Sequence, residues 1–228
     1  MRIALWFVLV AWPFAAQTAE ARGPGVTTLV VAPGLSVDRE RQELRIDAAM
    51  CLHRGIIEYL ICRSGSFEHE ALLSTSCQAS RLHAALLLIG GTPFPFLVDQ
   101  DWPARARTEP DANLEIAIEY LADGITQRRN IRCFLRNRER ADGVVDGGWI
   151  FTGAPFTSHD GRESYAADAS GALAGVTLRG GSVIQYGERL GVPYQGDYQG
   201  LEIDDTTAPP VGTQVRIIIS RRAPERSR

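Results

Sequence analysis

Large apolar residues alternate with polar ones along several short stretches of the chain, and this pattern predicts half-buried β-strands. The clearest stretch is LEIAIEYL at residues 114–121, where every second position is a large apolar residue. Other alternating or β-branched runs, separated by glycine and proline, predict further short strands. These runs lie at 44–52, 56–62, 68–75, 131–135, 149–152, 164–167, 173–178 and 215–219.

One stretch has the pattern of a helix, at about residues 77–89, and it is followed by the helix-ending signals Gly90-Gly91 and Pro93. From Ala84 onward the stretch is apolar on all sides, and such a helix is normally buried. One main buried helix among many short strands predicts an α+β fold that is mostly antiparallel β-sheet.

The strands predicted at 56–62 and 68–74 are separated by a short turn and are expected to pair as an antiparallel hairpin. Successive side chains of a strand point to opposite faces, so His69 and Glu70 are not expected to act together. The face that carries His69 is the more apolar one and should receive the helix. His69 is therefore expected to lie near His83 beneath that helix.

Two imidazoles at one strand–helix contact have three interpretations. They can belong to a metal site, although zinc usually takes three or four ligands, so His69 and His83 would need further donors. They can be buried structural histidines that hydrogen-bond to neighbouring groups. They can also serve a small ligand or handle protons. No cofactor other than a transition metal at this pair is expected.

The start of the chain has the layout of a secretory signal peptide, with Arg2, a short apolar run and an Ala-x-Ala site. An uncleaved membrane anchor is the alternative, but the run is shorter than the ~20 residues of a spanning helix and contains Pro13. The mature protein is expected to be periplasmic or extracellular, without a transmembrane span. The expected division is a signal peptide at 1–21, a leader at 22–35, one domain at 36–220 and a disordered tail at 221–228.

Charge and composition narrow the function classes. The net charge is −3, and all 24 basic residues are arginine, which excludes lysine nucleophiles. The negative charge and the lack of interleaved aromatic residues argue against a nucleic-acid partner. The sequence motifs of serine hydrolases, zinc proteases, P-loop proteins and dinucleotide-binding proteins are missing, which favours a non-catalytic role.

The chain has four cysteines, and in an exported protein disulfides are the usual state of cysteine. Their spacing contains no C-x-x-C pair, so a zinc ribbon or a thioredoxin-like dithiol is poorly supported. Four cysteines allow three pairings. The expected strand topology brings Cys51 and Cys77 to one end of the sheet, which favours Cys51–Cys77 and leaves Cys62–Cys133.

Two further segments are candidates for contact with a partner. Six arginines lie between residues 128 and 140, among them Arg128, Arg129 and Arg132. They predict either an anion-binding surface or an edge strand guarded by charge against aggregation. The proline-rich loop that follows the helix carries large apolar side chains that predict a docking patch, a lid or a plug of the core. These are Phe94, Phe96 and Trp102.

Several segments resemble the YdjY-type domain of exported bacterial proteins. They are IIEYLICRSGSFEHEALLSTSCQASRLHAALLLIGGTP, GGWIFTGAPF, YAADASGALAGV and APPVGTQVRIII, and the resemblance covers about residues 36–220. The chain departs from the usual pattern at Phe67, where lysine is common, and at Ala154-Pro155, which replaces a serine. The resemblance implies export and a single fold, and the family has no assigned activity.

The function expected from these observations is an exported YdjY-like domain that acts as a non-catalytic binding or accessory module. Its partner would be a protein or a small ligand, and the sequence leaves the oligomeric state open. The alternative is a small metal-binding protein or metalloenzyme centred on His69 and His83.

Overall fold

The computed structural model of the chain describes residues 28–95, 101–159, 161–177, 181–190 and 200–222. The strands are β1 Thr28–Ala32, β2 Leu35–Asp38, β3 Glu43–Met50, β4 Gly55–Ile57, β5 Tyr59–Arg63, β6 Ala71–Thr75, β7 Asn113–Ala122, β8 Ile125–Asn130, β9 Leu135–Asn137, β10 Trp149–Phe151, β11 Phe156–His159, β12 Arg162–Tyr165, β13 Ala172–Gly175, β14 Ile184–Tyr186, β15 Leu201–Ile203 and β16 Gln214–Arg221. The helices are α1 Ala79–Leu88, α2 Trp102–Arg107, α3 Ala166–Ser170 and the 3-10 helix η1 Ile131–Phe134.

Eight strands close into a barrel in the order β3-β16-β7-β10-β14-β13-β5-β6, with β6 pairing back to β3. All neighbours in this ring are antiparallel except β13–β14 and β5–β6, which are parallel. The inward side chains fill the barrel, as in other small barrels. Ile217 lies in register with Ile46 on one side and Ile118 on the other, and all three are fully buried.

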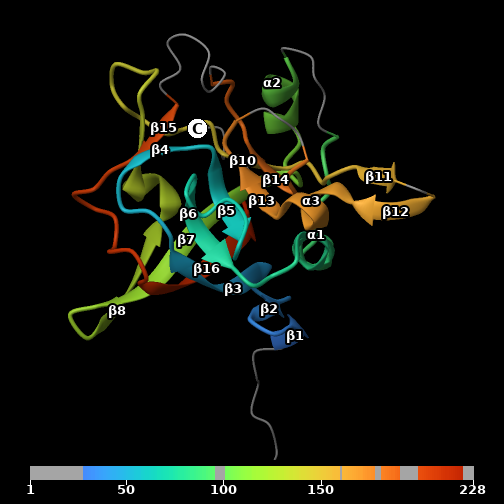
Figure 1. Cartoon of the computed structure of the whole chain (residues 1–228), viewed down its shortest axis with the longest axis horizontal. Coiled ribbons are helices and arrows are strands. Elements are labelled where there is room, and N and C mark those ends of the chain that lie inside the picture. Colours follow the sequence, from blue (N-terminus) through green and yellow to red (C-terminus); the bar gives the residue numbers. More distant parts are fainter. Residues whose placement is uncertain (1–27, 96–100, 160, 178–180, 191–199, 223–228) are drawn as a thin grey trace, which may run out of the picture.

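The remaining described strands extend or flank the barrel. β1 and β2 continue the sheet from β3, and β8 continues it from β7. The β7–β8 hairpin and the β11–β12 hairpin project on opposite sides of the molecule (Figure 1). A small separate sheet has the order β4-β15-β9. Closure leaves the barrel itself without edges, so the exposed strand edges belong to these additions.

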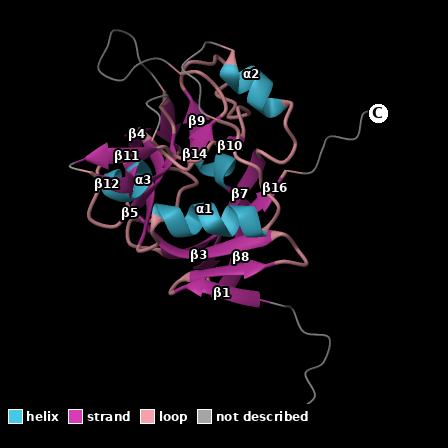
Figure 2. Ribbon diagram, turned by 90° about the vertical axis from the view of Figure 1, so that its right-hand side faces the viewer, coloured by secondary structure: helices cyan, strands magenta, loops and turns pink. Residues whose placement is uncertain are grey.

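The predicted α+β fold with one main buried helix is wrong, because the described chain is mostly β and has three short helices around a closed barrel. Helix α1 does form within the predicted range, and it packs against β1, β2, β13 and α3 (Figure 2). Only one side of it is covered. Leu82 and Leu86 are fully buried, whereas Leu87 and Leu88 are 48% and 41% exposed. Its apolar composition indicated burial on all sides, but the fold offers neighbours on one side only.

The predicted antiparallel hairpin is also wrong, since β5 and β6 are parallel, with Ile61 opposite Leu73. The connection at 64–70 turns back along β5, where the Glu70 carbonyl accepts the amides of Glu58 and Tyr59. Parallel neighbours normally need a connection of about a dozen residues or more, so a short turn indicated a hairpin. The antiparallel partner of β6 is instead β3, and this pairing closes the barrel.

Parts of the expected organisation fall outside the described residues, namely the signal peptide, most of the leader and most of the C-terminal tail. Residues 28–35, assigned to the leader, form β1 and begin β2. Within the ranges given above, no helix is long and apolar enough to cross a membrane.

Candidate functional site

His83 lies at the contact between α1, the end of β10 and the end of β12. Its Nδ1 is 2.7 Å from the hydroxyl oxygen of Tyr165, and its ring packs edge-on against Phe151 at a centroid distance of 4.9 Å. The Tyr165 hydroxyl oxygen also accepts the backbone amide of Ala154 at 2.9 Å. The Tyr165 hydroxyl therefore joins His83 to Ala154, and which group is the donor toward Nδ1 depends on the tautomer of the imidazole.

Neither partner of this hydrogen bond favours a charged form. Burial lowers the pKa of the His83 imidazole, and burial, as the largest cause, raises the pKa of the Tyr165 phenol. At neutral pH the pair is a neutral hydrogen bond in a mostly apolar contact. This arrangement fits a structural histidine that holds α1 in place.

Three of the four segments on which the predicted YdjY-type resemblance rests meet at this contact, the first of them carrying His83. Gly153, from GGWIFTGAPF, has a φ of 65°, and a Cβ there would lie 3.1 Å from Cε1 of His83. Asp168, from YAADASGALAGV, accepts the amide of Ser80 in the first turn of α1 at 2.9 Å. Both segments stand out in the sequence, but neither Tyr165 nor Asp168 was a predicted site residue. Their contacts with α1 join residues more than 80 positions apart, which no local pattern reveals.

His69 lies elsewhere, in the connection between β5 and β6. Its side chain is 71% exposed, and its Nε2 is 3.2 Å from Oε1 of Glu70. The expectations that His69 lies beneath α1 with His83 and that it is separated from Glu70 are therefore wrong. The alternation rule fails because residues 68–70 form a turn rather than a strand. Among the described residues, no group of three or more His, Cys, Asp or Glu side chains is arranged to hold a metal ion.

The apolar residues of the proline-rich loop fold inward where they are described. Trp102 opens α2 and is 1% exposed, in a small cluster with Ala106, Ala112 and Ile150. Phe94 is partly buried against the same cluster. Phe96 lies outside the described residues. Trp102 is therefore part of the core, and its candidacy as a docking residue is corrected.

Five of the six arginines in the arginine-rich segment pair with carboxylates. Arg128 is 2.7 Å from Glu43, and Arg132 is 3.2 Å from Glu115. Arg129 lies over the ring of Phe134, 5.8 Å from its centroid. The later arginines are paired in the same way, Arg136 with Asp204, Arg138 with Glu202 and Arg140 with Asp142 and Asp146. Matched charges of this kind favour a charge-guarded edge strand over an anion-binding surface.

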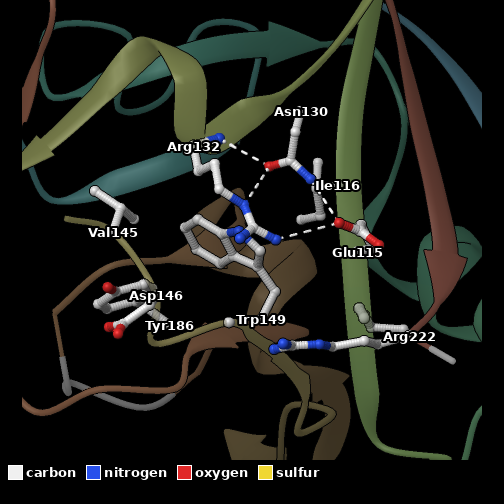
Figure 3. Close-up of a pocket in the computed structure, with 11 residues that line it drawn as sticks. Glu115, Ile116, Asn130, Arg132, Val145, Asp146, Trp149, Tyr186 and Arg222 are labelled. Carbon is white, nitrogen blue, oxygen red and sulfur yellow. Dashed lines mark hydrogen bonds and ion pairs between the residues drawn. The ribbon is translucent and has the colours of Figure 1, made fainter. Parts of the chain in front are cut away.

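A pocket between β7, η1 and β10 is too small for an organic ligand. Figure 3 shows Arg132 and Asn130 hydrogen-bonded to each other and to Glu115, beside Trp149. The cavity volume is about 20 Å³. That space holds about one water molecule. The polar network here stabilises the junction of η1 with the barrel.

The four cysteines are free thiols in the structure. Cys51 and Cys62 lie within hydrogen-bonding reach of each other. Cys77 is buried and near Asp168, and Cys133 is exposed on η1. The expected pairing of Cys51 with Cys77 and of Cys62 with Cys133 stays a prediction. It was inferred from a hairpin that the parallel pairing of β5 and β6 replaces.

The tip of the β7–β8 hairpin carries two exposed apolar side chains. Leu121 is 66% exposed and Ile125 is 67% exposed. Asp123 and Gly124 both have positive φ, 50° and 76°, as a tight two-residue hairpin turn requires. An open groove of about 380 Å³ begins beside the tip. Its lining residues are Asp47, Glu119, Tyr120, Leu121, Thr126, Gln214, Val215 and Arg216.

Two other open grooves, of about 490 and 430 Å³, follow the small β4-β15-β9 sheet. They are lined mainly by ion-paired residues such as Arg136 with Asp204 and Arg138 with Glu202. The groove at the hairpin differs because its lining includes the large exposed apolar side chain of Leu121. It is therefore the described surface best suited to a partner.

Comparison of the chain with models of protein families, with curated proteins and with solved structures found no match. The resemblance to YdjY-type domains stays a prediction from the sequence segments that carry it.

Proposed function

We propose that the protein is a non-catalytic binding module that holds an extended, apolar segment of a partner protein at the tip of the β7–β8 hairpin and in the groove beside it. The observation that carries this proposal is the exposure of Leu121 and Ile125 on a projecting hairpin. Fully burying an aliphatic side chain of this size contributes about 1.5–3 kcal/mol. Leu121 lies opposite Thr126 and Ile125 lies opposite Ala122, so the two side chains point to opposite faces of the hairpin, and Leu121 is the one that lines the groove.

The backbone of β8 supports the same mode of binding. Among the described residues β8 pairs only with β7, so its other edge is available to an added strand. Strand addition supplies backbone hydrogen bonds for affinity, and flanking side-chain contacts supply specificity. Leu121 and Thr126 lie opposite each other in this hairpin and both line the groove. A partner segment paired with β8 would lie along the edge of β8 that faces away from β7, with Thr126 and Leu121 on one face of the hairpin and Ile125 on the other.

The polar lining of the groove would select among such segments. Nε of Arg216 is 3.3 Å from Oδ1 of Asp47, and Glu119 lies 3.9 Å from Arg128. These residues are already paired, so they favour a largely neutral segment over a strongly charged one. The proposal therefore commits to a neutral, β-prone segment with apolar side chains.

The test is a selection of displayed linear peptides on the purified protein, followed by affinity measurements on variants. The double variant Leu121→Ser with Ile125→Ser is expected to lower peptide affinity at least tenfold without changing the midpoint of urea unfolding. The matched control is Leu29→Ser with Val30→Ser, which removes exposed apolar residues from the other terminal strand, β1. Loss of affinity in the control, with retention in the hairpin variant, would contradict the proposed site.

We also propose export, supported by the N-terminal pattern and by the resemblance to YdjY-type domains. Cleavage after Ala21 is expected, so N-terminal sequencing of the protein from the producing cell should begin at Arg22. An intact N-terminus at Met1 would contradict the cleavage. The metal-binding alternative has lost its geometric basis, because His69 is exposed beside Glu70 while His83 bonds to Tyr165.

A further inference from the structure

Cys51 and Cys62 meet because β6 lies between the strands that carry them. Ser74 of β6 is opposite Ala49 of β3 on one side and opposite Cys62 of β5 on the other. The amide of Cys51, just after β3, donates to the carbonyl of Leu72 at 2.9 Å and keeps Cys51 beside β6. From there its side chain reaches both Ser74 and the thiol of Cys62.

The two thiols are not equivalent. Cys62 is fully buried, whereas Cys51 is partly exposed. The hydrogen bond from Cys62 lowers the pKa of Cys51, and the same hydrogen bond, together with burial, raises the pKa of Cys62. Because the thiolate is the reactive form, the accessible member of the pair is also the more nucleophilic one. Ser66 and Phe67, from the connection between β5 and β6, contact Cys62.

The other two cysteines lack this arrangement. Burial, as the largest cause, raises the pKa of Cys77 to about 11, so its thiol is inert at neutral pH. Cys133 is exposed on η1, and its carbonyl accepts the hydroxyl of Thr207. The residues described in the structure therefore contain one pair of adjacent thiols with an accessible and a buried member.

We propose that Cys51 and Cys62 form a thiol–disulfide exchange site, in which Cys51 reacts with an external disulfide and Cys62 resolves the product. This chemistry needs no other residue of the chain and is independent of the partner-binding surface. Its oxidant is a disulfide, either of a small thiol or of another protein.

The reaction has two balanced steps. The Cys51 thiolate attacks one sulfur of the external disulfide, whose S–S bond breaks, and the released thiolate takes up a proton. Cys62 then attacks the sulfur of Cys51, which breaks the mixed disulfide, and the second external thiolate leaves with the proton of Cys62 as a thiol. Two cysteine thiols are oxidised by two electrons, and one external disulfide is reduced to two thiols.

The test uses reduced, folded protein carrying Cys133→Ser, which removes the exposed thiol, with glutathione disulfide as the probe. Samples are alkylated and analysed by intact mass and by peptide mapping without reduction. We expect both Cys51 and Cys62 to lose alkylation, no glutathione to be retained, and a peptide that links the two residues. Adding Cys62→Ser is expected to stop the reaction with one glutathione on Cys51. Adding Cys51→Ser is expected to slow the oxidation of Cys62 at least tenfold.

Mapping of the wild-type protein gives the same answer without relying on the folding of any variant. The proposal is overturned if Cys51 and Cys62 both stay alkylatable under conditions that convert Cys133. It is equally overturned if glutathione remains on Cys51 while Cys62 is intact, or if the mapped link joins Cys77 or Cys133.

Discussion

At His83, segments far apart in the sequence meet in a closed, hydrogen-bonded contact, whereas at the tip of the β7–β8 hairpin two large apolar side chains stand in solvent. The first region is closed by packing. The second region carries exposed apolar surface. The comparison teaches that residues brought together from distant segments can serve only the packing of the fold, whereas a surface available for binding is found from the exposure of its side chains.

The largest loss of stability is expected when a fully buried side chain is removed from the packed contact around α1. Leu86→Ala, at a fully buried position on α1, should lower the free energy of unfolding by about 2–5 kcal/mol because it leaves a cavity. Leu87→Ala is the matched control, since Leu87 is 48% exposed, and it should change this free energy much less. Urea unfolding measures both. Equal losses would mean that the outer side of α1 is also covered.

A smaller loss is expected from the hydrogen bond at the centre of the contact. Tyr165→Phe removes the hydroxyl that joins Nδ1 of His83 to the amide of Ala154. Leaving buried polar groups unsatisfied should cost about 1–3 kcal/mol of stability, measured by urea unfolding. Tyr120→Phe serves as the control, because its hydroxyl makes only a 3.5 Å contact with Gln127. If Tyr165→Phe left the free energy of unfolding unchanged, this hydrogen bond would not stabilise the closed contact at His83.

The pH dependence of stability sharpens the same comparison. Burial lowers the pKa of His83 below its ordinary value of 6.5, so the unfolded chain binds a proton at this residue more readily. The contribution of neutral His83 to the free energy of unfolding is therefore fully present above pH 6.5, and it declines as the pH falls toward the folded-state pKa. His83→Gln should reduce the decline seen in unfolding midpoints between pH 7 and pH 5. His69→Gln, at an exposed site, should leave it unchanged, and the reverse result would contradict the placement of the two histidines.

The smallest effect is expected on the arginine-rich surface. A double-mutant cycle of Arg128→Gln and Glu43→Gln should give a coupling of about 0.2–1 kcal/mol, since the arginine is solvent-exposed. Because the neighbouring arginines are also paired, the protein should show no salt-sensitive retention on anionic lipid vesicles. Strong retention at low salt that is lost in Arg129→Gln would restore the anion-binding hypothesis for this segment.

Local patterns predicted some of the elements and few of their partners. The strand predicted at 131–135 is largely the 3-10 helix η1, the predicted loop after α1 contains α2, and short strands such as β2, β8 and β14 were not predicted. The alternating stretch at 114–121 forms the centre of β7, and the apolar stretch at 77–89 contains α1. The turn between β5 and β6 was recognised, but its geometry was not, and so His69 was assigned to the wrong face. The predicted disulfide pairing rested on the same hairpin and stays untested. For the candidate sites, sequence composition marked the arginines and the loop aromatics, but their charge pairing and burial depend on residues elsewhere in the chain.

The sequence by itself determined which stretches extend and which coil, because backbone preference and hydrophobic period act over a few neighbouring residues. Only the tertiary structure decided that eight of these strands close into a barrel, that β5 and β6 run parallel, and that Cys51 meets Cys62 across β6. Many strands share the same alternating pattern, so the pattern does not choose among partners. The choice is made by the packing that closure allows, and that packing joins residues far apart in the chain.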